Sequence, residues 1–188
     1  DVDLLDLGEH TLRDVSGVHR IFQVCAPGLP AAFPPLTTVE ASPGNLPPSR
    51  SPLIGRAAEL DALVGLVGSC RLLTLTGVGG VGKSRLAREV AEQVRADFPG
   101  GVWWVELAPV GERHAVVART AEVLGVVLQP GMAAAARIAS AVAGRRMLLV
   151  LDNCEHVLDG AADVIEAILS GSDVQVMATS REGIGLQG

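Results

Sequence analysis

The stretch "LTLTGVGGVGKSRLAREV", Leu73–Val90, decides the fold, because it joins an apolar run to a helix-period run through a glycine-rich loop. The loop fits two phosphate-binding patterns at once. One is G-x-G-x-x-G, from Gly77 to Gly82, which is typical of dinucleotide sites. The other is G-x-x-x-x-G-K-S, from Gly77 to Ser84, which is typical of nucleoside triphosphate sites.

The charges that follow the loop favour the triphosphate. Lys83, Arg85 and Arg88 occupy the first turns of the predicted helix. Exposed cations at a helix N-terminus oppose the helix dipole, at a cost of about 0.3–1 kcal/mol each. A di- or triphosphate cradled by the loop amides would offset that cost. Lys83 would then reach the β- and γ-phosphates, and the Ser84 hydroxyl would ligate Mg²⁺.

A carboxylate after a later strand supports the same reading. The dinucleotide reading needs an acid about 20 residues past the loop, and Glu106, which closes "VWWVE", could serve. However, "MLLVLDN" is a strand-like run that ends in Asp152. At the C-terminal edge of a parallel sheet, Asp152 would face the same crevice as Ser84 and hold the Mg²⁺ shell. The structural alternative is a glycine turn in which Lys-Ser is coincidental.

The base is predicted to be adenine. Guanine sites usually carry an N-K-x-D or T-K-x-D loop after a late strand, and the sequence contains neither. The string "MATSREG" stands there instead and places Arg181 at the end of a strand. An arginine in this position would point at the γ-phosphate and distinguish ATP from ADP.

From residue 53 onward, apolar five-residue runs alternate with helix-period runs. This alternation predicts an α/β fold, with a parallel β-sheet flanked by helices on both faces. Together with the G-x-x-x-x-G-K-S loop, it indicates the P-loop NTPase type. Trp103 and Trp104 are adjacent and must face opposite sides of their strand. Both rings need cover, which fits a sheet that is buried on both faces.

Two segments precede this domain. Residues 1–25 contain two strand-like runs and predict a β-hairpin-like tail. Residues 26–52 hold eight of the eleven prolines, which predicts an extended linker without a core of its own. The predicted P-loop domain then covers residues 53–188.

Composition narrows the partners and the compartment. The net charge is −6 and the sequence has no run of Lys or Arg, so no direct contact with nucleic acid or an anionic membrane is expected. The three cysteines are far apart, which favours buried thiols in a reducing cytoplasm. No signal peptide is recognisable, and the apolar runs are far below the ~20 residues of a membrane span. The chain starts in mid-pattern, which suggests a piece of a longer protein.

Taken together, these motifs resemble the STAND class of signal-transduction ATPases, close to NB-ARC domains, and in particular the ATPase of large bacterial LuxR-type regulators. The matching strings are "LIGRAAEL", "LTLTGVGGVGKSRLA", "GGVWWVELAPV", "LLVLDNCEHVLDGAA" and "VMATSREGIGLQG". They cover most of residues 53–188. The resemblance implies that the strand before Arg181, called the sensor strand, lies between the strand before the phosphate loop and the strand that ends in Asp152. It also implies that the winged-helix and helical partner domains would follow Gly188.

The resemblance implies a role for each motif. Asp152 and Ser84 would hold Mg²⁺, while Lys83 and Arg181 would act on the phosphates. Residues that would bind the nucleotide are Leu53, Ile54 and Arg56 beside adenine, and Gly77, Val78, Gly79, Gly80, Val81, Gly82, Lys83, Ser84 and Arg85 around the phosphates.

One departure from the family bears on catalysis. Related ATPases that hydrolyse quickly carry a second acid directly after the magnesium aspartate, to polarise the attacking water. Asn153 stands there instead. Glu155, two residues on, could be a weak base or the start of the next helix. His156 is interpreted as structural. The sequence therefore predicts at most a slow ATPase.

The N-terminal string "LLDLGEHTLRDVSGVHRIFQVCAPGLP" is similar to the closing strands of class III adenylate or guanylate cyclase domains. The catalytic residues of that family would lie upstream, so this segment cannot be a cyclase by itself. An isolated hairpin is marginal in water, so we expect it to pack on the core, pair with another chain or fray.

The expected function is a cytoplasmic Mg-ATP/ADP-binding switch in a multidomain bacterial regulator, with slow or negligible hydrolysis. The expected partners are the nucleotide, the domains after Gly188 and, through self-association, a second copy of the chain. Two alternatives stay open. One is a cyclase–ATPase fusion whose main activity is cyclic nucleotide synthesis upstream, and the other is a degenerate scaffold that binds no nucleotide.

Overall fold

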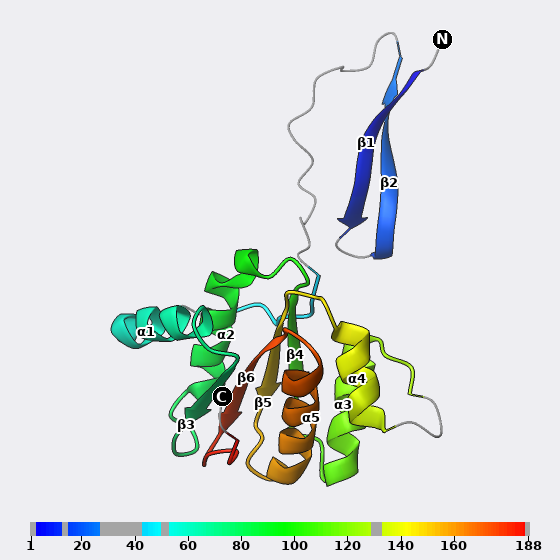
Figure 1. The fold of residues 1–188 in the computed structure, drawn as a ribbon. Coiled ribbons are helices and arrows are strands. Elements are labelled where there is room, and N and C mark those ends of the chain that lie inside the picture. Colours follow the sequence, from blue (N-terminus) through cyan, green and yellow to red (C-terminus); the bar gives the residue numbers. More distant parts are fainter. Residues whose placement is uncertain (1–2, 13–14, 27–42, 50–52, 129–132, 187–188) are drawn as a thin grey trace. The chain divides into compact units, whose positions relative to one another are not determined.

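The computed structural model describes residues 3–12, 15–26, 43–49, 53–128 and 133–186 (Figure 1). The chain divides into two compact units, Asp1–Ala41 and Ser42–Gly188. The first unit contains a two-stranded antiparallel sheet of β1 (Asp3–Leu12) and β2 (Val15–Cys25). Arg20 and Asp6 join the two strands through an ion pair of 2.6 Å. The two strand-like runs of the sequence therefore form one hairpin.

The second unit is built on a four-stranded parallel sheet in the order β3-β6-β5-β4. Its strands are β3 (Leu72–Thr76), β4 (Val102–Glu106), β5 (Leu148–Asp152) and β6 (Gln175–Ser180). The predicted position of the sensor strand is correct, because β6 lies between β3 and β5. All four strands run in the same direction, so their carboxyl ends meet at one edge, where the phosphate loop begins.

Helices cover both faces of this sheet, as predicted (Figure 1). On one face lie α1 (Ala57–Val67) and α2 (Lys83–Gln93), which is followed by the short 3₁₀ turn η1 (Arg95–Asp97). On the other face lie α3 (Arg113–Leu124), α4 (Ala134–Val142) and α5 (Leu158–Gly171). Every residue of β5 is buried, as expected for a central strand covered on both sides.

The adjacent tryptophans of β4 confirm the two-sided burial. Two buried hydrophobic clusters lie between the sheet and its helices, one under α1 and α2 and the other under α3, α4 and α5. Trp104 belongs to the first cluster, and Trp103 packs against the second. The Trp103 indole Nε1 donates to the Gly100 carbonyl at 3.0 Å. Each ring is therefore covered by a different helical layer, which anchors β4 between them.

A short piece of the proline-rich stretch belongs to the sheet unit. Gly44 forms a parallel bridge with Val102 at the edge of β4. The Asn45 side chain then imitates a strand backbone, because its Nδ2 donates to the Trp104 carbonyl at 2.9 Å and its Oδ1 accepts from the Trp104 amide at 2.6 Å. Leu46 packs on the cluster under α1 and α2. The compact unit thus reaches further toward the N-terminus than Leu53, where the sequence suggested that it begins.

Within the described part of the chain, no helix has both the length and the apolar character required to cross a lipid bilayer.

The close packing of α5 on α3 generates a stability prediction. A Cβ added at Gly160 would lie 2.5 Å from the Arg113 carbonyl oxygen and 2.8 Å from Val116 Cγ2. Gly160→Ala should therefore lower the free energy of unfolding by about 1–3 kcal/mol, the usual cost of overpacking. Gly65, inside α1, has open space at its Cβ position, so Gly65→Ala should raise stability by about 0.5–1 kcal/mol. Urea unfolding of both variants checks the opposite signs, and equal effects would contradict the packing described.

Candidate functional site

The phosphate-loop segment connects the end of β3 to the start of α2. Gly80 and Gly82 adopt φ values of 79° and 93°, which residues with a side chain rarely accept. Gly82 is the N-cap of α2, and no side chain caps the helix. The first turn contains no acid, so neither a side-chain cap nor a carboxylate within that turn offsets the positive end of the helix dipole. The loop and the helix N-terminus together form a site suited to an anion.

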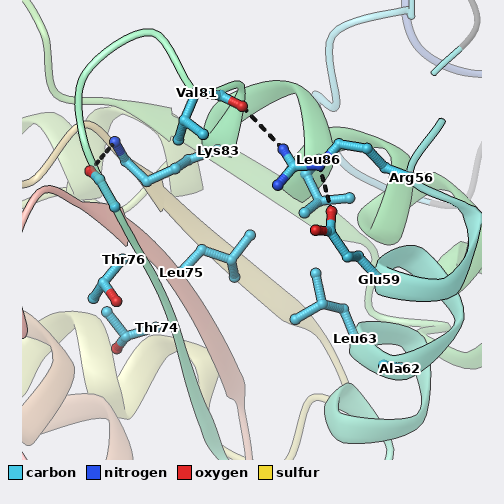
Figure 2. A pocket seen from close by; sticks show the side chains of 11 residues that line it. Arg56, Glu59, Ala62, Leu63, Thr74, Leu75, Thr76, Val81, Lys83 and Leu86 are labelled. Atoms are coloured by element: carbon cyan, nitrogen blue, oxygen red, sulfur yellow. Dashed lines mark hydrogen bonds and ion pairs between the residues drawn. The ribbon is translucent and has the colours of Figure 1, made fainter. Parts of the chain in front are cut away.

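Lys83 lies across the mouth of this loop (Figure 2). Its Nζ donates to the carbonyl oxygens of Gly77, at 2.8 Å, and Val78, at 3.1 Å. The ammonium group is therefore held within the loop, where it can exchange these carbonyls for phosphate oxygens without a large movement of its stem. Val78, Gly79, Gly80 and Val81 are exposed, and Ser84 is half-buried behind them.

Of the three cations that the sequence placed at the start of this helix, Arg88 has a different role. Its guanidinium lies over the Trp104 ring, 5.4 Å from the centroid. Arg88 therefore packs on β4 as part of the helix–sheet contact and does not serve the phosphate loop. Lys83 and the exposed Arg85 remain as the cations of the first turn.

Asp152 ends β5 at the same edge of the sheet and is only 8% exposed. The Thr179 hydroxyl donates to Asp152 Oδ1 at 2.6 Å, and the Asn153 backbone amide donates to the same hydroxyl at 2.9 Å. Asn153 itself has a positive φ of 69°. Thr179 thus holds the carboxylate and the turn after it, a role that the sequence did not reveal although the "ATS" string contains the residue.

The residues present fit a magnesium ion that is shared with a nucleotide. A carboxylate and a hydroxyl are oxygen donors of the kind that Mg²⁺ prefers, and the ion usually takes one or two carboxylates with phosphates and waters. Asp152 is buried, and within the part of the chain that the structure describes its Oδ1 accepts a single hydrogen bond, from a neutral hydroxyl. The described residues contain no group of three or more His, Cys, Asp or Glu side chains placed to hold a metal. Ser84 and Asp152 would therefore need the phosphates to complete the shell.

Glu155 and Arg181 form an ion pair beside the loop. Arg181 Nε lies 3.0 Å from Glu155 Oε1, and their side chains are 66% and 16% exposed. A Cβ added at Gly79 would lie 3.6 Å from Arg181 Nη2, so the guanidinium lies beside the loop. The structure therefore places Arg181, the predicted sensor, beside the phosphate loop. It also pairs Arg181 with Glu155, the predicted weak base.

His156 and Cys154 make contacts that suit structural roles. The His156 Nε2 faces the carbonyl oxygens of Leu107, at 3.0 Å, and Val110, at 2.7 Å, so this nitrogen carries a proton. Its Nδ1 lies 3.3 Å from Asn153 Nδ2. Burial raises the pKa of the Cys154 thiol to about 12, with a smaller contribution from the Asp152 carboxylate. Cys154 is therefore protonated and unreactive at neutral pH.

A cavity of about 420 Å³ continues from the loop toward α1 (Figure 2). This volume falls in the range of small-molecule sites. Arg56 stands at its rim, pairs with Glu59 and donates to the Val81 carbonyl at 2.9 Å. The cavity is lined mainly by apolar side chains, with two threonines and the loop lysine; the lining residues besides Arg56 and Glu59 are Ala62, Leu63, Thr74, Leu75, Thr76, Gly77, Val81, Lys83 and Leu86.

Two residues expected beside the base lie outside this lining. Leu53 packs on the cluster under α1 and α2, and Ile54 is 83% exposed. Only Arg56 of that motif lines the cavity. Glu59 and Leu63 line it from α1, and helix periodicity one turn and two turns after Arg56 could have identified them.

The strand order argues against the dinucleotide alternative. In the doubly wound dinucleotide fold, the strand that ends in the ribose-binding acid pairs directly with the strand before the loop. Glu106 ends β4, which lies at the opposite edge of the sheet from β3, with β6 and β5 between them. Glu106 therefore cannot serve that purpose.

Comparison with known proteins agrees with this geometry. Residues 52–177 match the AAA ATPase domain family. An uncharacterised protein of Mycobacterium tuberculosis is 41% identical over 136 residues, which is 72% of this chain and 35% of that protein. A putative HTH-type transcriptional regulator of the same species is 43% identical over 65% of this chain. The regulatory protein AfsR of Streptomyces coelicolor is 34% identical over 77% of this chain.

The chain spans only 14% and 16% of the length of those two regulators. Among solved structures, the fold resembles Cdc6p of Pyrobaculum aerophilum, with a TM-score of 0.52 at 16% identity, covering 77% of this chain and 41% of that one. The ORC2 protein of Aeropyrum pernix has a TM-score of 0.51, also at 16% identity, covering 69% and 42%. These structural likenesses support the parallel α/β fold alone.

The family match spans well over half of the chain and includes the phosphate loop and the buried aspartate. The chain therefore belongs to the AAA ATPase domain family.

Proposed function

We propose that this domain binds Mg-ATP and Mg-ADP as the switch module of a bacterial transcription regulator and hydrolyses ATP slowly or not at all. The observation that carries the proposal is the uncapped, acid-free N-terminus of α2 behind a glycine loop, at the same sheet edge as the buried Asp152. Loop amides, Lys83 and a bound Mg²⁺ would share the charge of the phosphates.

The cavity beside β3 supports a nucleotide that extends from the loop toward α1. Gly77 and Lys83 belong to the phosphate-loop motif and also line the cavity, so the cavity is continuous with the phosphate site. Apolar side chains of α1, β3 and α2, among them Leu63, Leu75 and Leu86, offer a surface for a flat base. We therefore place adenine in this cavity and the ribose near Arg56.

The turn after β5 argues for weak hydrolysis. Asn153 occupies the position of the second acid, and a neutral amide cannot accept the proton of an attacking water. Glu155 is the acid next in sequence, and its Oε1 is engaged by Arg181. When bound, Mg²⁺ would stabilise negative charge on the phosphates, but this chain presents no well-placed base among its described residues. Sustained phosphate release from the purified protein would favour the second candidate, a true ATPase.

The place of the domain in a regulator is supported by its relatives. Two relatives with 43% and 34% identity are named as regulators, and the structurally similar ORC2 protein was solved as ADPNP and ADP complexes. The motifs favour a STAND or NB-ARC type within a LuxR-type regulator. We further propose a cytoplasmic protein in which another domain provides the output and residues 1–25 belong to a cyclase-like domain. Self-association would be a further partner interaction.

Lys83→Ala tests the phosphate site. The substitution removes a charge-assisted contact worth about 1.5–3 kcal/mol, which corresponds to about 10–100-fold weaker binding of Mg-ATP. Isothermal titration calorimetry measures the dissociation constants. Arg145→Ala is the matched control, because Arg145 is an exposed cation just before β5, at the opposite end of the sheet. Equal affinity of Lys83→Ala and the parent would refute the phosphate site.

Asp152→Asn tests the metal. At about 100 times its dissociation constant, Mg-ATP should stabilise the parent by about 2.7 kcal/mol. Because Asp152 would hold the Mg²⁺ shell, the variant should lose most of the difference between melting curves recorded with ATP plus Mg²⁺ and with ATP plus EDTA. Differential scanning calorimetry of both proteins provides the comparison. A magnesium-dependent shift that is the same in variant and parent would remove Asp152 from the site.

A further inference from the structure

The ion pair between Glu155 and Arg181 joins two turns at the carboxyl edge of the sheet. Glu155 follows β5 and Arg181 follows β6, two strands that are neighbours in the sheet. Their side chains differ in burial, because Glu155 is 16% exposed and Arg181 is 66% exposed. The Glu155 carboxylate is therefore the fixed partner. It restrains the exposed Arg181 side chain, which is called the arm below.

The guanidinium of Arg181 lies beside Gly79 of the phosphate loop, with its plane facing that residue. Measured to the position that a Cβ on Gly79 would take, Arg181 Nη2, Cζ and Nε lie at 3.6, 3.7 and 3.7 Å. Three nearly equal distances mean that the plane of the group faces the loop. An alanine at residue 79 would therefore be in ordinary van der Waals contact with the guanidinium, which places the group directly beside Gly79.

Glu155 binds Arg181 through Nε, the guanidinium nitrogen nearest to the aliphatic part of the side chain. Its Oε1 accepts from Arg181 Nε at 3.0 Å. The terminal nitrogens, Nη1 and Nη2, make no hydrogen bond with the described residues. Because the arm is held at Nε, the two terminal groups remain available to a ligand above the loop. Glu155 Oε2 is buried and likewise has no hydrogen-bond partner among the described residues, so the carboxylate can accept a second bond if the arm shifts.

We propose that Glu155 is a positioning residue, which holds Arg181 over the loop so that its terminal nitrogens meet the third phosphate of ATP. This inference rests on the proposed nucleotide site. An exposed arginine has many rotamers, and an anchor at Nε removes part of the conformational entropy lost on binding. Since ADP lacks the third phosphate, the anchor contributes to ATP affinity and leaves ADP affinity nearly unchanged. Glu155 thereby acts in nucleotide discrimination and not as a base.

The test compares the dissociation constants of Mg-ATP and Mg-ADP in calorimetry. Glu155→Ala should weaken ATP binding about 3–10-fold, the size of coupling between contacting residues, and change ADP binding less than about twofold. Glu155→Gln keeps an acceptor oxygen and should lose less. Glu182→Ala is the matched control, because Glu182 is an exposed acid next to Arg181 in sequence and outside the pair.

A second variant separates positioning from a general structural effect. In an Arg181→Ala background, Glu155→Ala should no longer lower the ratio of ATP to ADP affinity, because the arm that it positions is gone. Additive losses, an unchanged ratio in Glu155→Ala, or a higher preference for ATP would each overturn the inference. If Glu155→Ala does not fold, the same cycle with Glu155→Gln decides. Failure of the parent to bind either nucleotide would instead overturn the proposed function, and this inference with it.

Discussion

The start of α2 is the constraint on which the account depends. A helix that begins at Lys83 with no side-chain cap and no acid in its first turn leaves several backbone N–H groups and two cations on one spot. The glycine loop brings further amides to the same place, because Gly80 and Gly82 take conformations that other residues resist. This concentration of positive charge costs free energy when no ligand is bound, and a multiply charged anion would offset that cost.

The parallel sheet arranges the rest of the site around this helix end. Because β6 lies between β3 and β5, its end residue Thr179 can hold Asp152, and Arg181 can reach the loop. The same order sends Glu106 to the opposite edge and so decides between two ligands that the loop motif alone leaves open. Strand order therefore determines which polar side chains meet at the phosphate loop.

Sequence patterns predicted the parts that depend on local chemistry. The phosphate loop, the helix periodicity, the strand that ends in Asp152 and the opposite burial of Trp103 and Trp104 all follow from residue spacing. The contacts that depend on tertiary packing could not be predicted. Arg88 has the same charge as its neighbours, but its position one turn further along α2 places it over Trp104. Asn45 lies in a proline-rich stretch, and its pairing with β4 requires an edge strand that only the folded sheet provides.

The central claim is that backbone amides at the start of α2 bind phosphate, and amide chemical shifts in two-dimensional ¹⁵N–¹H NMR test it most directly. Titration of the full chain with Mg-ADP should move the signals of residues 79–84 more than any others. It should leave amides at the opposite end of the sheet, near Gly144, unmoved. Saturating nucleotide that perturbs no amide in residues 79–84 would contradict the account.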